Sequence, residues 1–147
     1  MRPTPRASSD ARSREGSLAL INRVELTAAA AELLASLVAR HGPVMFHQSG
    51  GCCDGSAPMC YLRGEFRVGA SDVLLGEVSG GTPFWMSADQ FKYWSHTHLT
   101  VDVVPGRGSG FSLEAPEGVR FLIRSRLFTD DEVLALANQP VRTGADG

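Results

Sequence analysis

The chain has 147 residues, enough to bury one core, and its 43% hydrophobic and 20% charged residues are typical of a globular domain. Its formal net charge of −2 lacks the basic excess that a nucleic-acid-binding surface normally needs, so we expect no nucleic-acid partner. No apolar run approaches the roughly 18 residues of a membrane helix, and the start lacks a signal-peptide core, which predicts a cytoplasmic protein without a membrane partner.

The two ends of the chain are predicted to lie outside the folded body. Residues 1–17 are rich in Arg, Ser and Pro and have almost no large apolar side chain, so they cannot offset the entropy lost on ordering. They are expected to form a disordered tail. Residues 18–140 are predicted to form one globular domain, and residues 141–147 a frayed C-terminus.

The first ordered element is predicted to be a helix that begins near Thr27, a good N-cap, and continues through AAAAELLASLVAR. Gly42 and Pro43 then end it. Its buried face would consist of the apolar residues at helical spacing, Leu33, Leu34, Leu37 and Val38.

After this helix the sequence changes to short β-like runs separated by Gly, Asp, Ser and Pro. A second short helix is expected after Ser87, and a third over TDDEVLALANQ, with Thr129 as its N-cap. The chain is therefore predicted to have an α+β fold, in which an N-terminal helix packs on a small twisted or barrel-like, mostly antiparallel β-sheet and a short helix lies near the C-terminus. The predicted strands lie within residues 43–48, 60–68, 72–78, 83–87, 98–104, 111–115 and 119–128.

The segment FHQSGGCCDGSAPMCY contains all three cysteines, Cys52, Cys53 and Cys60, and begins within a predicted strand. An odd number of clustered cysteines fits reduced thiols in a cytoplasm better than a disulfide framework. Thiolates are soft ligands that suit iron, an iron-sulfur cluster, zinc or copper, so this loop is the candidate functional site. Its glycines permit a close backbone approach to a ligand: Gly50, Gly51 and Gly55.

Three sulfurs per chain are too few for a tetrahedral metal site, so a further ligand is required. Asp54, a small molecule, a histidine or a second subunit could supply it, and a homodimer is therefore predicted. The candidate nitrogen ligands are His47, His96 and His98.

His47 lies on the strand that enters the loop, and His96 and His98 would point to the same side if both lie on one strand. The alternative for these two is that they are surface residues at a turn. The alternative for Cys60 is a buried core cysteine beside Tyr61.

Two family resemblances follow from these motifs. The stretch from His41 to Phe128, with HQSGGCCDGSAPMC, FWMSADQF and FSLEAPEGVRFLIRSRLF, resembles a bacterial family known only as a domain of unknown function, number 779. Members of that family are often encoded beside aldehyde dehydrogenases, which implies a partner of that class.

The order LTAAAAELLASLVARHGP, a strand, SGGCCDG, FWMSADQFKYWSHTHLTVDVV and SGFSLEAPEG is more distantly similar to the A-type iron-sulfur carriers, the HesB-like proteins. This similarity implies a helix before a β-rich fold and places Cys52 at the position of the carriers' loop cysteine. The carriers' C-terminal Cys-Gly-Cys has no counterpart in RFLIRSRLF, so the similarity implies the fold more directly than the cluster.

The sequence thus predicts a thiolate metal-binding or iron-sulfur accessory protein that serves an aldehyde or alcohol dehydrogenase system, rather than a self-contained enzyme. The alternative is a cysteine-dependent enzyme that attacks an aldehyde or a disulfide. In that case His47 would be the base, and the glycine amides would form an oxyanion hole.

Overall fold

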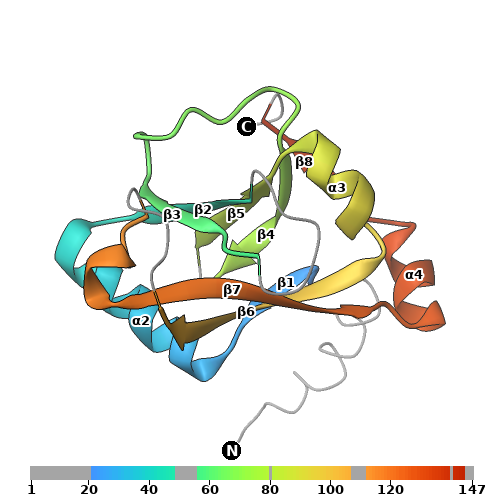
Figure 1. The fold of residues 1–147 in the computed structure, drawn as a ribbon. Coiled ribbons are helices and arrows are strands. Elements are labelled where there is room, and N and C mark those ends of the chain that lie inside the picture. Colours follow the sequence, from blue (N-terminus) through green and yellow to red (C-terminus); the bar gives the residue numbers. More distant parts are fainter. Residues whose placement is uncertain (1–20, 49–55, 80, 107–111, 140, 145–147) are drawn as a thin grey trace, which may run out of the picture.

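A computed structural model describes residues 21–48, 56–79, 81–106, 112–139 and 141–144. Two β-sheets face each other, and helices lie at their ends (Figure 1). None of the described helices is both long and apolar enough to cross a membrane. The elements in chain order are β1 (Val24–Leu26), α2 (Ala28–His41), β2 (Val44–Gln48), β3 (Met59–Leu62), β4 (Val73–Val78), β5 (Thr82–Met86), α3 (Ala88–Trp94), β6 (Thr97–Pro105), η1 (Ala115–Glu117), β7 (Val119–Leu127), α4 (Asp130–Leu136) and β8 (Arg142–Thr143).

The strands form a three-stranded sheet of order β1-β6-β7 and a five-stranded sheet of order β3-β2-β5-β4-β8. Within the described part of the chain, β1 with β6 and β2 with β5 are the parallel pairs, and the other pairs are antiparallel. The predicted α+β class, with a helix against a mostly antiparallel β body, is confirmed. That body consists of two open sheets and not of a closed barrel.

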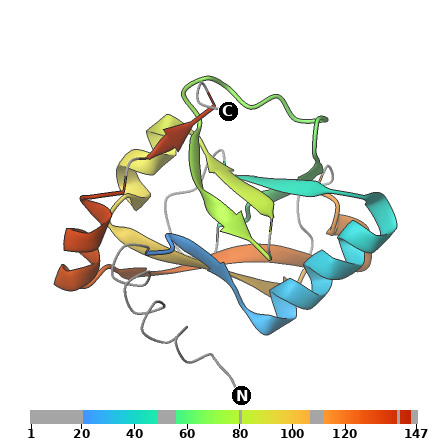
Figure 2. The same ribbon diagram turned by 180° about the vertical axis from the view of Figure 1, so that it is seen from behind.

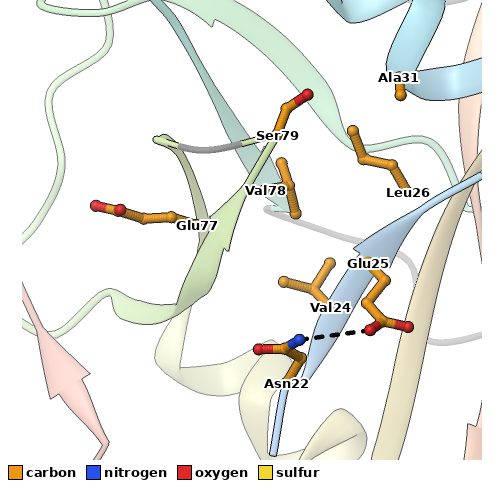
Figure 3. A pocket seen from close by; sticks show the side chains of 8 residues that line it. All are labelled: Asn22, Val24, Glu25, Leu26, Ala31, Glu77, Val78 and Ser79. Atoms are coloured by element: carbon orange, nitrogen blue, oxygen red, sulfur yellow. Dashed lines mark hydrogen bonds between the residues drawn. The ribbon is translucent and has the colours of Figure 1, made fainter. Parts of the chain in front are cut away.

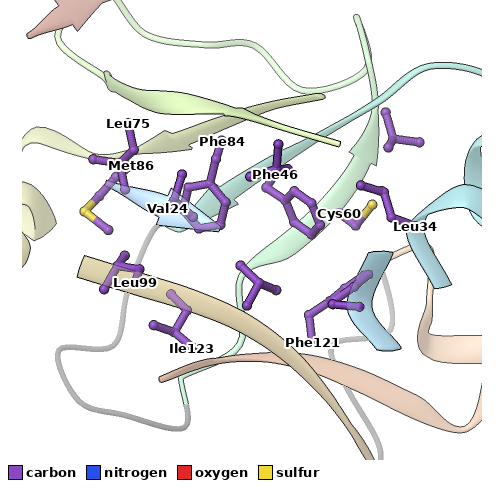
Figure 4. Packing of buried hydrophobic residues seen from close by; sticks show 14 of the residues in the cluster. Val24, Leu34, Phe46, Cys60, Leu75, Phe84, Met86, Leu99, Phe121 and Ile123 are labelled. Carbon is purple, nitrogen blue, oxygen red and sulfur yellow. The ribbon is translucent and has the colours of Figure 1, made fainter. Parts of the chain in front are cut away.

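The hydrophobic core fills the space between the two sheets (Figure 4). Phe46 of β2 stacks on Phe84 of β5 with ring centroids 5.5 Å apart, and it meets the edge of Phe121 of β7 at 4.9 Å. All three phenylalanine side chains are fully buried. Because β2 is buried along its whole length, the segment that leads into the cysteine loop starts from a rigid part of the molecule.

Helix α2 packs at one end of the core and has the boundaries that the sequence predicts. The Thr27 hydroxyl accepts a hydrogen bond from the Ala30 N–H (3.1 Å) and donates one to Asp102 Oδ1 (3.0 Å). Gly42 ends the helix with a φ of 95°, a conformation that glycine adopts without strain. Leu34 and Leu37 are buried, and Leu33 and Val38 pack against the core from partly buried positions.

The structure differs from the prediction at the N-terminal side of this helix. The first described element is β1 and not the helix, because Val24–Leu26 pairs in parallel with residues 99–101 of β6. Three residues are too few for an alternating pattern to be visible in the sequence. This strand therefore depends on a partner that lies about 75 residues away along the chain.

Three other segments also differ from the expected strands. The run predicted over residues 60–68 stops at Leu62, where a turn begins. Residues 112–115, expected within a strand, instead lead into η1, and the Leu113 N–H donates to the Cys60 carbonyl (3.0 Å). At the C-terminus, part of the segment expected to fray forms β8, which pairs with β4.

Helices α3 and α4 are confirmed, and each begins after the expected capping residue, Ser87 or Thr129. In α4 the Thr129 hydroxyl accepts the Glu132 N–H (3.2 Å), and Glu132 Oε1 accepts the Thr129 N–H (2.8 Å), which completes a capping box. The Arg126 guanidinium binds both oxygens of Glu132 and is the main cause that lowers the pKa of this carboxyl to about 2.

We expect Thr129→Ala to lower the free energy of unfolding by about 1 kcal/mol, because the variant leaves an N-terminal N–H of α4 without its acceptor. Thr129→Ser keeps the hydroxyl and is the matched control. Urea unfolding followed by circular dichroism measures both variants. Equal stability of the alanine and serine variants would contradict this role of Thr129.

Candidate functional site

The loop between β2 and β3 is attached to the two sheets at both of its ends. Before the loop, the Gln48 carbonyl accepts a hydrogen bond from the Ser87 N–H (3.2 Å). After it, the Ser56 carbonyl accepts one from the Ile123 N–H of β7 (2.8 Å). The loop residues singled out from the sequence lie outside the described residues: Gly50, Gly51, Cys52, Cys53, Asp54 and Gly55.

His47 is the second-last described residue before this loop, and its side chain is 4% exposed. Its Nε2 lies 3.0 Å from Asp72 Oδ2, and its ring centroid lies 4.4 Å from that of Phe66. Asp72 Oδ2 also accepts the Gly69 N–H (2.9 Å), which fixes the carboxylate. The imidazole is therefore held in one orientation by a charge-assisted hydrogen bond and an aromatic neighbour.

Sequence reasoning found His47 but missed Asp72 and Phe66. Both lie in the segment between β3 and β4, and Asp72 is 25 positions from His47. The sequence GASDV marks a turn before a strand, but it does not reveal which side chain that turn meets. The contact between His47 and Asp72 depends on the path of the β3–β4 segment over the sheet, and only the tertiary structure shows that path.

Cys60 lies on the inner face of the five-stranded sheet, paired with Phe46 across β2 and β3 and fully buried in the core (Figure 4). Burial is the main cause that raises the pKa of its thiol to about 12, and the nearby Glu114 carboxylate raises it further. A thiol in these surroundings keeps its proton at neutral pH. These surroundings favour the alternative stated above, a core cysteine.

Glu114 is a buried carboxyl that the sequence pattern did not single out, and it is 1% exposed. It accepts hydrogen bonds from the Ser112 hydroxyl and from the Phe121 N–H, the latter at 3.4 Å. Ser112 Oγ in turn accepts the Cys60 N–H (2.8 Å). Burial is the main cause that raises the pKa of Glu114. The cluster joins β3 and β7 to the segment that leads into η1.

The two histidines that were predicted to share a strand face are in different surroundings. β6 begins at Thr97, so His96 lies in the preceding turn and is exposed, as the turn alternative proposed. His98 is buried on β6, where its Nε2 lies 3.2 Å from Glu25 Oε1 and its ring meets the edge of Phe128. Among the described residues, no three His, Cys, Asp or Glu side chains form a group that could hold a metal ion.

A hollow of about 490 Å³ lies between β1 and β4 (Figure 3). Asn22 Nδ2 donates to Glu25 Oε2 within it (3.4 Å), and Val24, Leu26 and Val78 supply apolar walls. Its acidic side chains are Glu25, which also faces His98, and Glu77. No described cysteine or histidine is among the residues that line this hollow.

The family model described as domain of unknown function DUF779 matches residues 33–127, which include β2, the cysteine loop and both sheets in part. No curated protein matches the chain.

Proposed function

The chain belongs to the DUF779 family, and we propose that it is an accessory protein that binds a soft metal ion or an iron-sulfur unit through the thiolates of Cys52 and Cys53. His47 is the proposed nitrogen ligand. Cys60 is left out of this ligand set because its thiol is buried and holds its proton.

The position of His47 carries this proposal. A histidine that binds a metal usually has its other ring nitrogen hydrogen-bonded to a carboxylate or a carbonyl, which fixes the ring and increases its basicity as a ligand. The buried contact between His47 Nε2 and Asp72 Oδ2 has this form. It lies at the end of β2, five positions before Cys52 in the sequence.

The donor chemistry fits iron, zinc or cuprous copper. Two thiolates and one imidazole give three soft or intermediate ligands, and a tetrahedral site needs a fourth. In this proposal the fourth ligand comes from a second copy of the chain or from a small molecule. When bound, the metal would serve as cargo for a client enzyme. The proposed client is an aldehyde or alcohol dehydrogenase system, a choice that rests on the gene neighbourhood implied by the family resemblance.

The test measures metal stoichiometry in anaerobically purified protein, followed by titration of the metal-free protein with Co²⁺ and Zn²⁺. We expect Cys52→Ser, Cys53→Ser and Asp72→Asn each to weaken metal affinity by about 10- to 100-fold. Affinity should also fall as the pH falls, because protons compete with the metal for the sulfurs. His96→Gln is the matched control, since His96 is exposed in a turn.

The Cys60→Ser variant distinguishes a metal site in the loop from the alternative in which the cysteines only pack and no metal binds. It should lower stability, because it places a hydroxyl in the core, but it should leave metal affinity unchanged. Metal affinity that is the same in all the loop variants, with a stability loss only in Cys60→Ser, would reject the metal site.

The same His47–Asp72 contact also favours a second candidate, a cysteine-dependent enzyme. A carboxylate that orients a histidine is the arrangement that activates a nucleophile for attack on a carbonyl or a disulfide. This candidate predicts that Cys52 or Cys53 ionises well below pH 8 in metal-free protein. The pH dependence of alkylation by iodoacetamide measures that ionisation, and His47→Gln should shift it upward. Alkylation that follows an ordinary thiol pKa would exclude this candidate.

A further inference from the structure

The segment between β3 and β4, residues 63–72, arches over the outer face of the five-stranded sheet (Figures 1 and 2). Its far side meets the C-terminal strand region, where Gly69 and Gly144 pack against each other. A Cβ at Gly144 would come within 2.0 Å of the Gly69 carbonyl oxygen. At the end of the arch next to β3, the ring of Phe66 stacks on the ring of Tyr61 of β3, with ring centroids 4.8 Å apart. The arch is therefore fixed to the sheet at both sides.

A pocket of about 470 Å³ lies between the arch and the sheet, within the usual size range of small-molecule sites. Successive residues of a strand point to opposite faces, so the residues next to the buried Val44, Phe46 and Phe84 face outward. The walls are largely apolar and include two aromatic rings. They are formed by Met45, Phe66, Val68, Leu74, Pro83 and Trp85.

Two arginines, Arg63 and Arg142, also line this pocket, and both residues are exposed. Elsewhere in the molecule Arg40, Arg124 and Arg126 each bind a carboxylate. Within the part of the chain that the structure describes, the side chains of Arg63 and Arg142 have no such partner. A planar guanidinium binds a carboxylate through two parallel hydrogen bonds, so these two groups are suited to an anionic ligand.

Glu77 is the one acidic residue among the described residues that line the pocket. Two arginines and one glutamate give the pocket a formal charge of +1, which favours an anionic ligand. The aromatic rings of Phe66 and Trp85 favour a flat apolar body. These properties together describe a small aromatic or unsaturated carboxylate.

We propose that this pocket binds a small carboxylate with a flat apolar body, which the positive charges of Arg63 and Arg142 attract and whose body lies against Phe66 and Trp85. Phe66 also contacts His47, so a ligand here lies one side chain from the buried His47–Asp72 pair. The site requires no metal ion.

Isothermal titration of the metal-free full chain with benzoate tests this site, and benzamide is the neutral probe of the same shape. We expect saturable binding of benzoate at about millimolar concentration, and binding of benzamide that is at least about tenfold weaker. Arg63→Gln and Arg142→Gln should each weaken benzoate binding by about tenfold or more and leave benzamide unaffected. Quenching of tryptophan fluorescence by benzoate should be lost in Trp85→Phe, since Trp94 is buried away from this pocket.

Arg67→Gln is the matched control, because Arg67 belongs to the same arch but does not line the pocket. It should bind benzoate as the unmodified chain does. Absence of saturable benzoate binding, equal affinity for benzoate and benzamide, or equal weakening by Arg67→Gln would each overturn the proposal. These measurements use metal-free protein, so their failure is distinct from failure of the thiolate metal site.

Discussion

Leu37→Ala is expected to lower the free energy of unfolding by about 2–5 kcal/mol. Leu37 has no exposed surface and belongs to the core cluster that α2 shares with both sheets. Removal of its branched end loses the transfer free energy of buried methyl groups and leaves a cavity that a close-packed core fills only in part.

Leu33→Ala is the matched control, because Leu33 lies on the same helix but is only partly buried against the core. Its loss should be clearly smaller than that of Leu37→Ala. Urea unfolding of both variants, with the slope of the transition checked for two-state behaviour, gives the comparison. Equal losses below about 1 kcal/mol would mean that α2 does not pack on the core as described.

Glu114→Ala is the second change with a large expected effect. The variant removes the acceptor of the Ser112 hydroxyl and of the Phe121 N–H, and both groups are buried. A buried polar group left without its partner costs about 1–3 kcal/mol, so the expected loss is about twice that range for the two groups. Glu114→Gln keeps an acceptor oxygen and should lose much less. Unfolding of both variants at pH 5 measures the difference.

The pH dependence of the free energy of unfolding gives a second test of the role of Glu114. Burial raises the pKa of Glu114 in the folded state, whereas an unfolded carboxyl of this type titrates near about 4.3. The folded chain therefore keeps a proton that the unfolded chain releases. The contribution of Glu114 to the free energy of unfolding is fully present below its pKa in the unfolded chain. It is lost as the pH rises through its pKa in the folded chain.

The difference in unfolding free energy between the unmodified chain and Glu114→Gln isolates this contribution. Asp102 and Glu132 have lowered pKa values and produce the opposite slope at lower pH, but they are the same in both proteins. The unmodified chain should lose stability relative to Glu114→Gln as the pH rises from about 4.3. A difference that does not change between pH 4 and pH 8 would show that Glu114 is not shifted.

Local signals explain why the helices could be predicted from the sequence. Thr27 and Gly42 define α2, and Thr129 begins α4, because caps satisfy backbone groups within a few residues of themselves. The strand β1 has no comparable local signal, since its formation depends on β6. Residues 112–115 resemble a strand in composition, but Ser112 and Leu113 instead bond to Cys60.

The candidate site could be predicted only in part for the same reason. His47 was recognised because it precedes a glycine- and cysteine-rich loop, which is a local feature of the sequence. Its partner Asp72, the buried Glu114, and the pocket residues Arg63 and Arg142 are distant from it in the sequence, and tertiary folding determines what each contacts. The role of Cys60 was open between ligand and core residue, and its pairing with Phe46 places it in the core.

The pairing of strands that are distant in the sequence also determines when the molecule can fold during synthesis. β1 pairs with β6, whose own antiparallel partner β7 ends at Leu127, and β4 receives β8 only at Arg142 and Thr143. A nascent chain that has passed α2 therefore has neither sheet complete, and β2, which is buried along its whole length in the folded chain, is not yet paired with β5. Because both sheets are completed late, by contacts between residues that are distant in the sequence, we expect folding to be slow. Until then, unpaired strand edges are exposed and can pair with other nascent chains. Both sheets can therefore be completed only after residues up to Thr143 have been made.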